Sequence, residues 1–256
     1  MTTTATTVDS IPSIDHQEAM PVAAREYDAF VALLRSLDDA DWSHPTDNDE
    51  WDVRATALHV LGATASNASF REMVHQMRTG RKLYKEIGAG RWHHWVDGVN
   101  EIQIRDRSTL TNAEIANAFA AIAPKAVAGR KRLPAPVRAL RVVDLPEPYT
   151  KRQSLGWLTD VCYTRDTWMH RVDIARATGK PLVLTPEHDG RLVADMVREW
   201  STLHADPFDL ELTGDAGGHF QRGDGGERVS VDAVEFIRIV SMRAPGTGVL
   251  ANPMPL

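Results

Sequence analysis

The sequence contains very little cysteine, since Cys162 is the only one among 256 residues. A single cysteine excludes an internal disulfide, a CxxC redox pair and a zinc site rich in thiolates. A metal site in this chain must therefore use histidine and carboxylate ligands. We interpret Cys162 itself as a small core residue, because no base that would activate a nucleophilic thiol is evident in the sequence.

The chain also lacks a basic stripe, a long apolar run and a targeting segment. Its net charge of −6 argues against nucleic acid as the main partner. No apolar run is long enough to span a bilayer, and residues 1–7 have neither the basic residues nor the apolar stretch of a signal peptide. We therefore expect a cytoplasmic protein with no membrane partner. Nothing suggests a large apolar interface, so we expect a monomer.

Helical patterns dominate the first two thirds of the chain. Capping residues and apolar periodicity predict four main helices, with Gly80 and Gly179 as stop signals after the second and the fourth. These helices fall at about 15–37, 52–77, 111–132 and 154–178. A long proline-rich connection precedes the last of them. Four helices with one long crossover predict an antiparallel bundle.

The pattern changes after Gly179. A further helix over about 185–203 is followed by an alternating strand at 208–212, glycine-rich turns, short strands and a helix capped by Asp232. This order is typical of a small α+β unit. We accordingly divide the chain into three parts. They are a disordered tail over 1–14, a helical bundle over 15–182 and a small α+β domain over 183–256.

The segment around Asp166 and His170 is the most informative for chemistry. Residues four apart on a helix share one face, so these two side chains are suited to bind one metal ion, and Asp173 lies on the same stripe. The spacing alone is weak, because a second such pair, Asp215 and His219, falls in a glycine-rich turn. A solvated pair on the helix surface is the alternative interpretation.

His59 is the second candidate. Its helical neighbours three and four positions away are all small, which leaves room around the ring for a metal or a ligand. A core histidine bonded to a carbonyl group is the alternative. Two facing helices of a bundle that supply His59, Asp166 and His170 would form a site of two imidazoles and one carboxylate. Such a set suits zinc and leaves a coordination position open, as in catalytic zinc sites.

At this point the sequence resembles a known family. The segment from Trp51 to His59, the run Arg165–Ala175 and the stop at Gly179 resemble the DinB-like bundle of the mycothiol-dependent maleylpyruvate isomerase family of actinobacteria. The runs from Leu210 to Gly214, from Ser241 to Arg243 and at the C-terminus are similar to the small α+β domain of that family. The resemblance covers most of the chain.

The resemblance implies a zinc-type site whose positions here are His59, Asp166 and His170. The isomerase has glutamate as its carboxylate, whereas Asp166 is one methylene shorter, so its carboxylate binds differently or through water. The resemblance also implies an arginine from a Gly-Arg turn that reaches the active site. Arg243 stands there, with Met242 in place of the usual glycine. A solvated cation at a helix end is the alternative for Arg243.

These features predict a metal-dependent enzyme that uses mycothiol as its thiol cofactor and acts on a small molecule. Coordination to a divalent cation stabilises the thiolate. In a reaction like that of maleylpyruvate isomerase, this thiolate adds to an activated C=C bond, the adduct rotates, and elimination returns the trans isomer. Transfer of the thiol to an electrophile is the other reaction open to such a site. A non-catalytic metal-containing binding or regulatory module is the alternative class.

Overall fold

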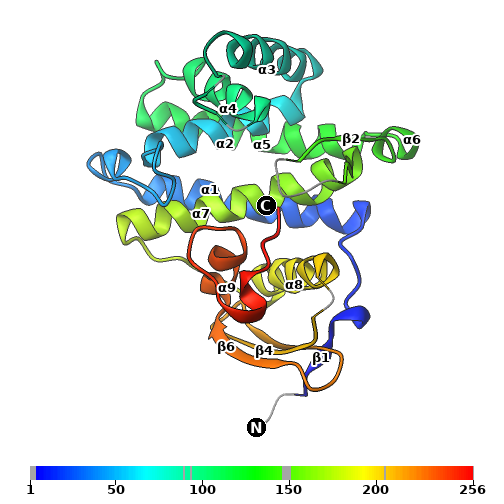
Figure 1. The fold of residues 1–256 in the computed structure, drawn as a ribbon. Coiled ribbons are helices and arrows are strands. Elements are labelled where there is room, and N and C mark those ends of the chain that lie inside the picture. The colour runs from blue at the N-terminus through cyan, green and yellow to red at the C-terminus, as the bar shows by residue number, and fades with distance from the viewer. Residues whose placement is uncertain (1–3, 89, 93, 146–150, 205, 256) are drawn as a thin grey trace. The chain divides into compact units, whose positions relative to one another are not determined.

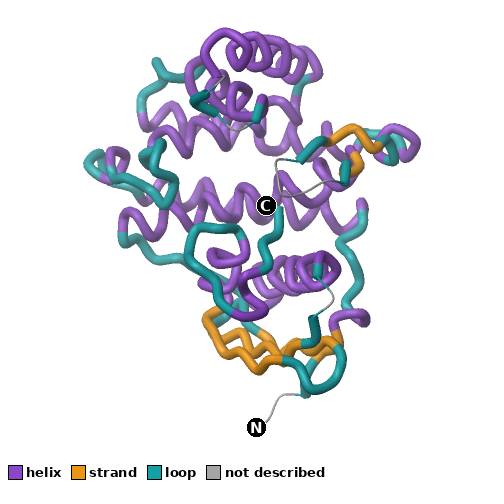
Figure 2. The backbone as a smooth tube through the Cα atoms, in the orientation of Figure 1, coloured by secondary structure: helices purple, strands orange, loops and turns teal. Residues whose placement is uncertain are grey.

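A computed structural model describes residues 4–88, 90–92, 94–145, 151–204 and 206–255 (Figure 1). The chain divides into two compact units, one formed by Asp15–Leu182 and the other by Met1–Ile14 together with Val183–Leu256. Helices dominate the first unit, and the four-stranded sheet belongs to the second (Figure 2). Among the described residues, no helix has both the length and the apolar content needed to cross a membrane.

The first unit is built on a bundle of four helices, as the sequence predicts. They are α1 (His16–Ser36), α2 (Val53–Ala68), α5 (Asn112–Lys131) and α7 (Tyr163–Thr178). Each contributes apolar side chains to one core, where the ring of Phe119 lies 5.5 Å from Tyr27 and 5.0 Å from Phe30. A buried ion pair also joins two of the helices: Arg171 Nε donates to Glu26 Oε1 at 2.8 Å.

Capping residues set the ends of these helices. The Asp15 carboxylate accepts backbone N–H bonds at the start of α1, and Asp52 does the same for α2. Thr111 and Glu114 form the predicted capping box of α5. Gly179 ends α7 in the left-handed conformation that glycine adopts without strain. Local sequence therefore specifies where the bundle helices begin and end.

The second predicted helix is wrong in one respect, because two helices occupy its place. Ser69 adopts an extended conformation that ends α2, and its hydroxyl caps α3 (Phe70–Leu83). Gly80 lies inside α3 and does not stop it. A Cβ there would lie 2.6 Å from the backbone of Val99, so Gly80 permits the close approach of α4 (Trp95–Arg105).

The connection before α7 contains short elements. They are α6 (Ala135–Arg138), β2 (Arg141–Val143), β3 (Gln153–Ser154) and the π-helical turn η4 (Trp157–Cys162), whereas another π-helical turn, η3 (Tyr84–Gly88), lies between α3 and α4. Strands β2 and β3 pair antiparallel. In η4 the buried Asp160 carboxylate lies 2.9 Å from His16 Nδ1 and accepts a bond from Arg138 at 3.2 Å. This acid thereby fastens the start of α7 to α1 and α6.

The second unit packs helices on a sheet. Its elements are η1 (Val8–Ser10), η5 (Pro186–Gly190), α8 (Arg191–Leu203), β4 (Phe208–Thr213), β5 (Gly218–Arg222), β6 (Glu227–Asp232), α9 (Ala233–Val240) and η6 (Gly248–Ala251). The strand order is β1-β5-β4-β6, with β4 antiparallel to β5 and parallel to β6. Phe208, Leu210 and Leu212 alternate inward along β4, as a strand with one buried face requires. The predicted small α+β domain is therefore present.

The predicted disordered tail over residues 1–14 is wrong for its described residues, 4–14. Strand β1 (Thr6–Thr7) pairs in parallel with β5, and the side chains of Val8, Ile11 and Ile14 are buried. Residues 1–3 lie outside the described part of the chain. Three apolar side chains spaced three residues apart pack here against a unit that is distant in sequence. The segment by itself contains too few apolar residues to predict that it is ordered.

Candidate metal centre

The structure brings the side chains of His59, Asp166 and His170 together. One ligand atom from each lies within 4.8 Å of the other two. Asp166 stands between the histidines, with Oδ2 3.5 Å from His59 Nε2 and Oδ1 3.4 Å from His170 Nε2. Both imidazoles are buried, whereas 26% of the Asp166 side chain is exposed. The cluster therefore opens to solvent on the carboxylate side.

Helix geometry explains why these residues meet. Asp166 and His170 are one turn apart on α7, so their side chains lie on one face. His59 comes from α2, which packs against α7. The two imidazole rings lie 5.1 Å apart and nearly perpendicular, at 80°. This arrangement lets both Nε2 atoms face the carboxylate at the same time.

Asp173 contacts the ring nitrogen of His170 that faces away from Asp166. Its Oδ2 lies 3.1 Å from His170 Nδ1, and only 1% of the Asp173 residue is exposed. A carboxylate on one ring nitrogen places the proton there and leaves the other nitrogen free to bind a metal. Asp173 thus directs His170 Nε2 toward Asp166.

The charges of the cluster are strongly coupled. Burial by itself raises the pKa of the Asp166 carboxyl, but the charge of His170 and hydrogen bonds to both histidines hold that pKa well below its usual range. Burial likewise lowers the pKa of His170, yet Asp166, with help from Asp173, outweighs it and raises that pKa to about 9. Metal binding at His170 Nε2 therefore competes with a proton on this imidazole.

The donor set fits a divalent metal. Two imidazole nitrogens and a carboxylate are the ligands that zinc takes in many catalytic sites. Two ligands of a tetrahedral zinc ion stand about 3.3–3.6 Å apart, because each lies about 2.0–2.2 Å from the metal. The separations of 3.4 and 3.5 Å on either side of Asp166 match this spacing. Asp166 is thus placed to serve with either histidine despite being shorter than glutamate.

Gly62, one of the small residues around His59, has a different role from the predicted one. The space above Gly62 is filled, since a Cβ there would lie 2.4 Å from Cβ of Gln103 on α4. Gln103 also donates to Gln76, which in turn donates to the Gly62 carbonyl at 2.9 Å. Glycine at this position therefore allows α4 to pack closely on α2, and the space is not a ligand cavity.

Trp51 is a residue of the centre that spacing arguments miss. Its ring lies 4.7 Å from that of His59, tilted by 36°, and 5.9 Å from that of His170. Trp51 precedes α2, so helical periodicity relates it to neither histidine. Nearby Arg54 is structural: its guanidinium donates to Asn112 Oδ1 at 2.6 Å and so joins α2 to the start of α5.

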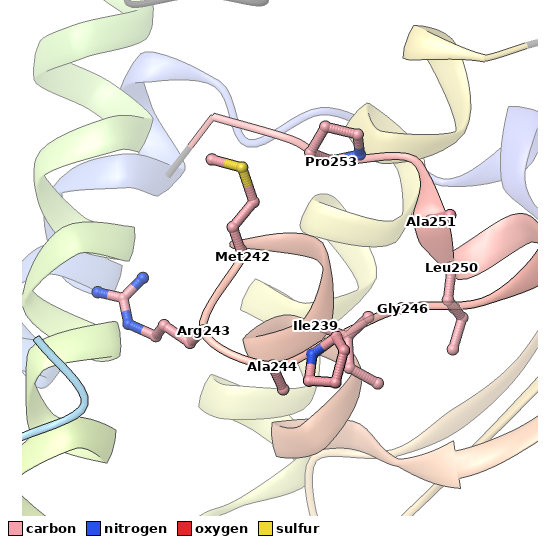
Figure 3. Close-up of a pocket in the computed structure, with 9 residues that line it drawn as sticks. Ile239, Met242, Arg243, Ala244, Gly246, Leu250, Ala251 and Pro253 are labelled. Carbon is pink, nitrogen blue, oxygen red and sulfur yellow. The ribbon is translucent and has the colours of Figure 1, made fainter. Parts of the chain in front are cut away.

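Arg243 lies in the other unit, in the turn after α9. It lines a pocket together with Ile239, Leu250 and Pro253, and in Figure 3 its guanidinium extends away from those side chains. The preceding residue, Met242, has a φ of 65°, a left-handed conformation that glycine adopts without steric cost. The usual glycine of this turn is thus explained by its backbone. Arg243 as a functional residue stays a prediction.

Fold and side chains together define a four-helix-bundle protein with a buried cluster of two histidines and a carboxylate, joined to a small α+β unit. The chain belongs to the family of the mycothiol maleylpyruvate isomerase N-terminal domain, which its residues 23–175 match. The matched segment includes His59, Asp166 and His170.

Solved structures show the same fold. The chain is similar to the crystal structure of the mycothiol-dependent maleylpyruvate isomerase, with a TM-score of 0.56 and 14% sequence identity. The match covers 93% of this chain and 92% of that one. A histidine-to-alanine mutant of that isomerase matches equally well. No curated protein matches the chain.

Proposed function

We propose that the protein is a metal-dependent enzyme that uses mycothiol and catalyses a cis–trans isomerisation like that of maleylpyruvate isomerase. The observation that carries the proposal is the convergence of His59, Asp166 and His170 in a chain of this family. The two Asp166 oxygens lie 3.5 Å from His59 Nε2 and 3.4 Å from His170 Nε2, separations that suit two ligands of a tetrahedral metal. The family supports mycothiol as the thiol.

The three side chains would hold the metal, most simply zinc, and three protein ligands leave one position open. A divalent ion there stabilises a thiolate at neutral pH, and so provides a nucleophile for an activated C=C bond. The exposed side of Asp166 is where a thiol and a substrate would enter. Asp173 contributes by holding the His170 ring with Nε2 toward the centre.

Arg243 is the proposed substrate-binding cation. Its guanidinium is suited to a substrate carboxylate through paired hydrogen bonds, and to stabilising negative charge as it develops during thiol addition. Arg243→Lys would keep the charge and lose the planar fork, so we expect a higher KM and a lower kcat. Metal content should not change, because Arg243 is not a metal ligand.

Transfer of the thiol to a small electrophile is the second reaction that the same centre supports. It shares the nucleophile and differs in the step that follows addition. The shorter Asp166 carboxylate and Met242 in the turn before Arg243 depart from the isomerase pattern, and they are the reason to test this reaction. Assays with maleylpyruvate and with model electrophiles, each with and without mycothiol, separate the two reactions.

Metal analysis is the first experiment. We expect close to one zinc per chain in the purified protein, and loss of zinc in His59→Ala and His170→Ala. His75→Ala is the matched control, because that histidine is half exposed and pairs with Asp106 instead. If the wild type and the three alanine variants have the same metal content, the protein is not the proposed metalloenzyme. Zinc without turnover of any thiol substrate favours a binding or regulatory module.

A further inference from the structure

The two histidines of the centre are oriented in different ways. His170 has a hydrogen bond from its outer nitrogen, Nδ1, to the Asp173 carboxylate. The corresponding Nδ1 of His59 is buried and has no hydrogen-bond partner among the described residues. A metal-binding histidine usually donates its other ring N–H to an acceptor that fixes the ring. Within the described residues, no acceptor at Nδ1 therefore fixes the His59 ring as Asp173 fixes that of His170.

Trp51 contacts this ring instead. The centroids of the indole and the His59 imidazole lie 4.7 Å apart at an interplanar angle of 36°, a tilted contact at a distance typical of aromatic pairs. The same indole lies 5.9 Å from His170 at 45°. One large apolar ring thus lies next to both imidazoles.

Hydrogen bonds fix the backbone of Trp51 in the turn before α2. Its N–H donates to the Asn48 carbonyl at 3.0 Å, and its carbonyl accepts bonds from the N–H and the hydroxyl of Thr46 at 3.2 and 2.9 Å. The turn is also fastened to the end of α7, since His44 Nδ1 lies 3.0 Å from the Ala177 carbonyl oxygen. The indole is therefore attached to the helix that carries Asp166 and His170.

We propose that Trp51 is a positioning residue of the metal centre, whose indole orients His59 in place of a hydrogen-bond acceptor and keeps water from that side of both imidazoles. The proposal rests on the metal centre of the proposed function and deepens it. The centre then has two different supports. A carboxylate fixes the α7 imidazole, and a stacked ring fixes the α2 imidazole.

Removal of the indole should loosen His59 without removing a ligand. In Trp51→Ala the His59 imidazole can rotate away from Asp166 and is exposed to water. We therefore expect the zinc affinity to fall about 10- to 100-fold, as it does when a ligating histidine loses its outer hydrogen-bond partner. Trp51→Phe keeps a stacking ring and should lose less than Trp51→Ala. Affinity is measured by competition with a chromophoric chelator. Circular dichroism shows whether each variant is folded.

Trp95→Phe is the matched control. This indole is in the same unit, on α4, and packs under the Arg81 guanidinium at 4.2 Å. Its replacement should leave zinc affinity unchanged. If the wild type binds zinc through His59 and His170 while Trp51→Ala binds it equally well, Trp51 has no positioning role and the proposed function still stands. If the wild type binds no zinc, the proposed function itself fails.

Fluorescence gives a second measurement that does not need the alanine variant to fold. Co²⁺ bound at the centre should quench Trp51 emission strongly, because the indole touches a ligand ring. Trp51→Phe should lose this part of the quenching, whereas Trp95→Phe should retain it. Equal quenching in the wild type and Trp51→Phe would show that the indole does not lie against the bound centre, which contradicts the proposal.

Discussion

The bundle and the α+β unit each bury a histidine, and their surroundings have opposite effects on its charge. His170 on α7 lies between two carboxylates, and its pKa is raised to about 9. His204 at the end of α8 lies against the ring of Trp200 at 4.4 Å, and neither of its ring nitrogens makes a hydrogen bond within the described residues. Burial lowers its pKa, and the charge of Asp206 opposes this only in part.

This difference shows that burial of a histidine is not by itself a sign of function. His204 is a flat ring that completes an aromatic cluster with Trp200 and Phe208. His170 has acidic partners on both ring nitrogens. In a residue that only fills the core, this arrangement would cost stability, because each carboxylate loses hydration when it is buried. Acidic partners on its ring nitrogens, more than burial, distinguish His170 from the packing residue His204.

The largest effect should come from the carboxylate between the two histidines. Asp166→Asn removes a ligand charge, and we expect zinc affinity to fall by more than the roughly 100-fold that loss of an outer partner costs. Asp166→Glu keeps a carboxylate at this position and should retain zinc. Both are measured by chelator competition. Tight zinc binding by Asp166→Asn would show that the carboxylate is not a ligand and would remove the contrast with His204.

Asp173→Asn should have a smaller effect on the same site. The amide can still contact His170 Nδ1 but no longer provides a charge that favours the correct tautomer, so we expect zinc affinity to fall about 10- to 100-fold. Asp209→Asn is a suitable control, since that acid pairs with His219 in the sheet of the other unit. An unchanged affinity in Asp173→Asn would mean that packing alone orients His170.

Replacement of His204 tests whether this histidine serves only as a packing ring. His204→Phe removes two buried nitrogens that make no hydrogen bond within the described residues and keeps a ring against Trp200, so we expect the free energy of unfolding to rise by about 1 kcal/mol and the Tm by about 2–4 °C. Thermal or denaturant unfolding measures both. A destabilised variant would mean that the histidine has a polar role in the cluster.

The pH dependence of this variant has a definite sign. The folded pKa of His204 lies below its unfolded value, so the unfolded state takes up the proton first as the pH falls. The wild type should therefore lose stability from about pH 6.5 downward, where an unperturbed histidine titrates. The groups that act on His204 are Asp206 and Arg222, and neither is changed. His204→Phe should show a flatter decline than the wild type in unfolding experiments carried out over this pH range.

Cys162→Ala should have the smallest effect. The residue lies at the end of η4, two turns before His170, and the thiol is not needed if the reactive thiol is a cofactor. We expect unchanged zinc content and turnover, and a loss of about 1 kcal/mol in stability at most. Loss of activity with intact metal would instead make Cys162 part of the chemistry.

Some elements of this protein follow from local sequence. Asp15, Asp52 and Thr111 are good caps, and each begins a helix in the structure. Alternation predicts the strand at Phe208 because one face of it is buried. The break at Ser69 also has a local signal, because Ser69 and Glu72 have the spacing of a capping box and the Ser69 hydroxyl caps α3, but the helical pattern that continues past it favours one long helix.

The sequence by itself determined the ends of the bundle helices and placed Asp166 and His170 on one face, because helix periodicity and capping act between neighbours in the chain. Only the tertiary structure brought His59 to that face, set Trp51 on its ring, and drew residues 6–7 into a sheet with β5. These contacts join segments many residues apart. Their energy comes from burial that no short stretch of sequence can supply alone.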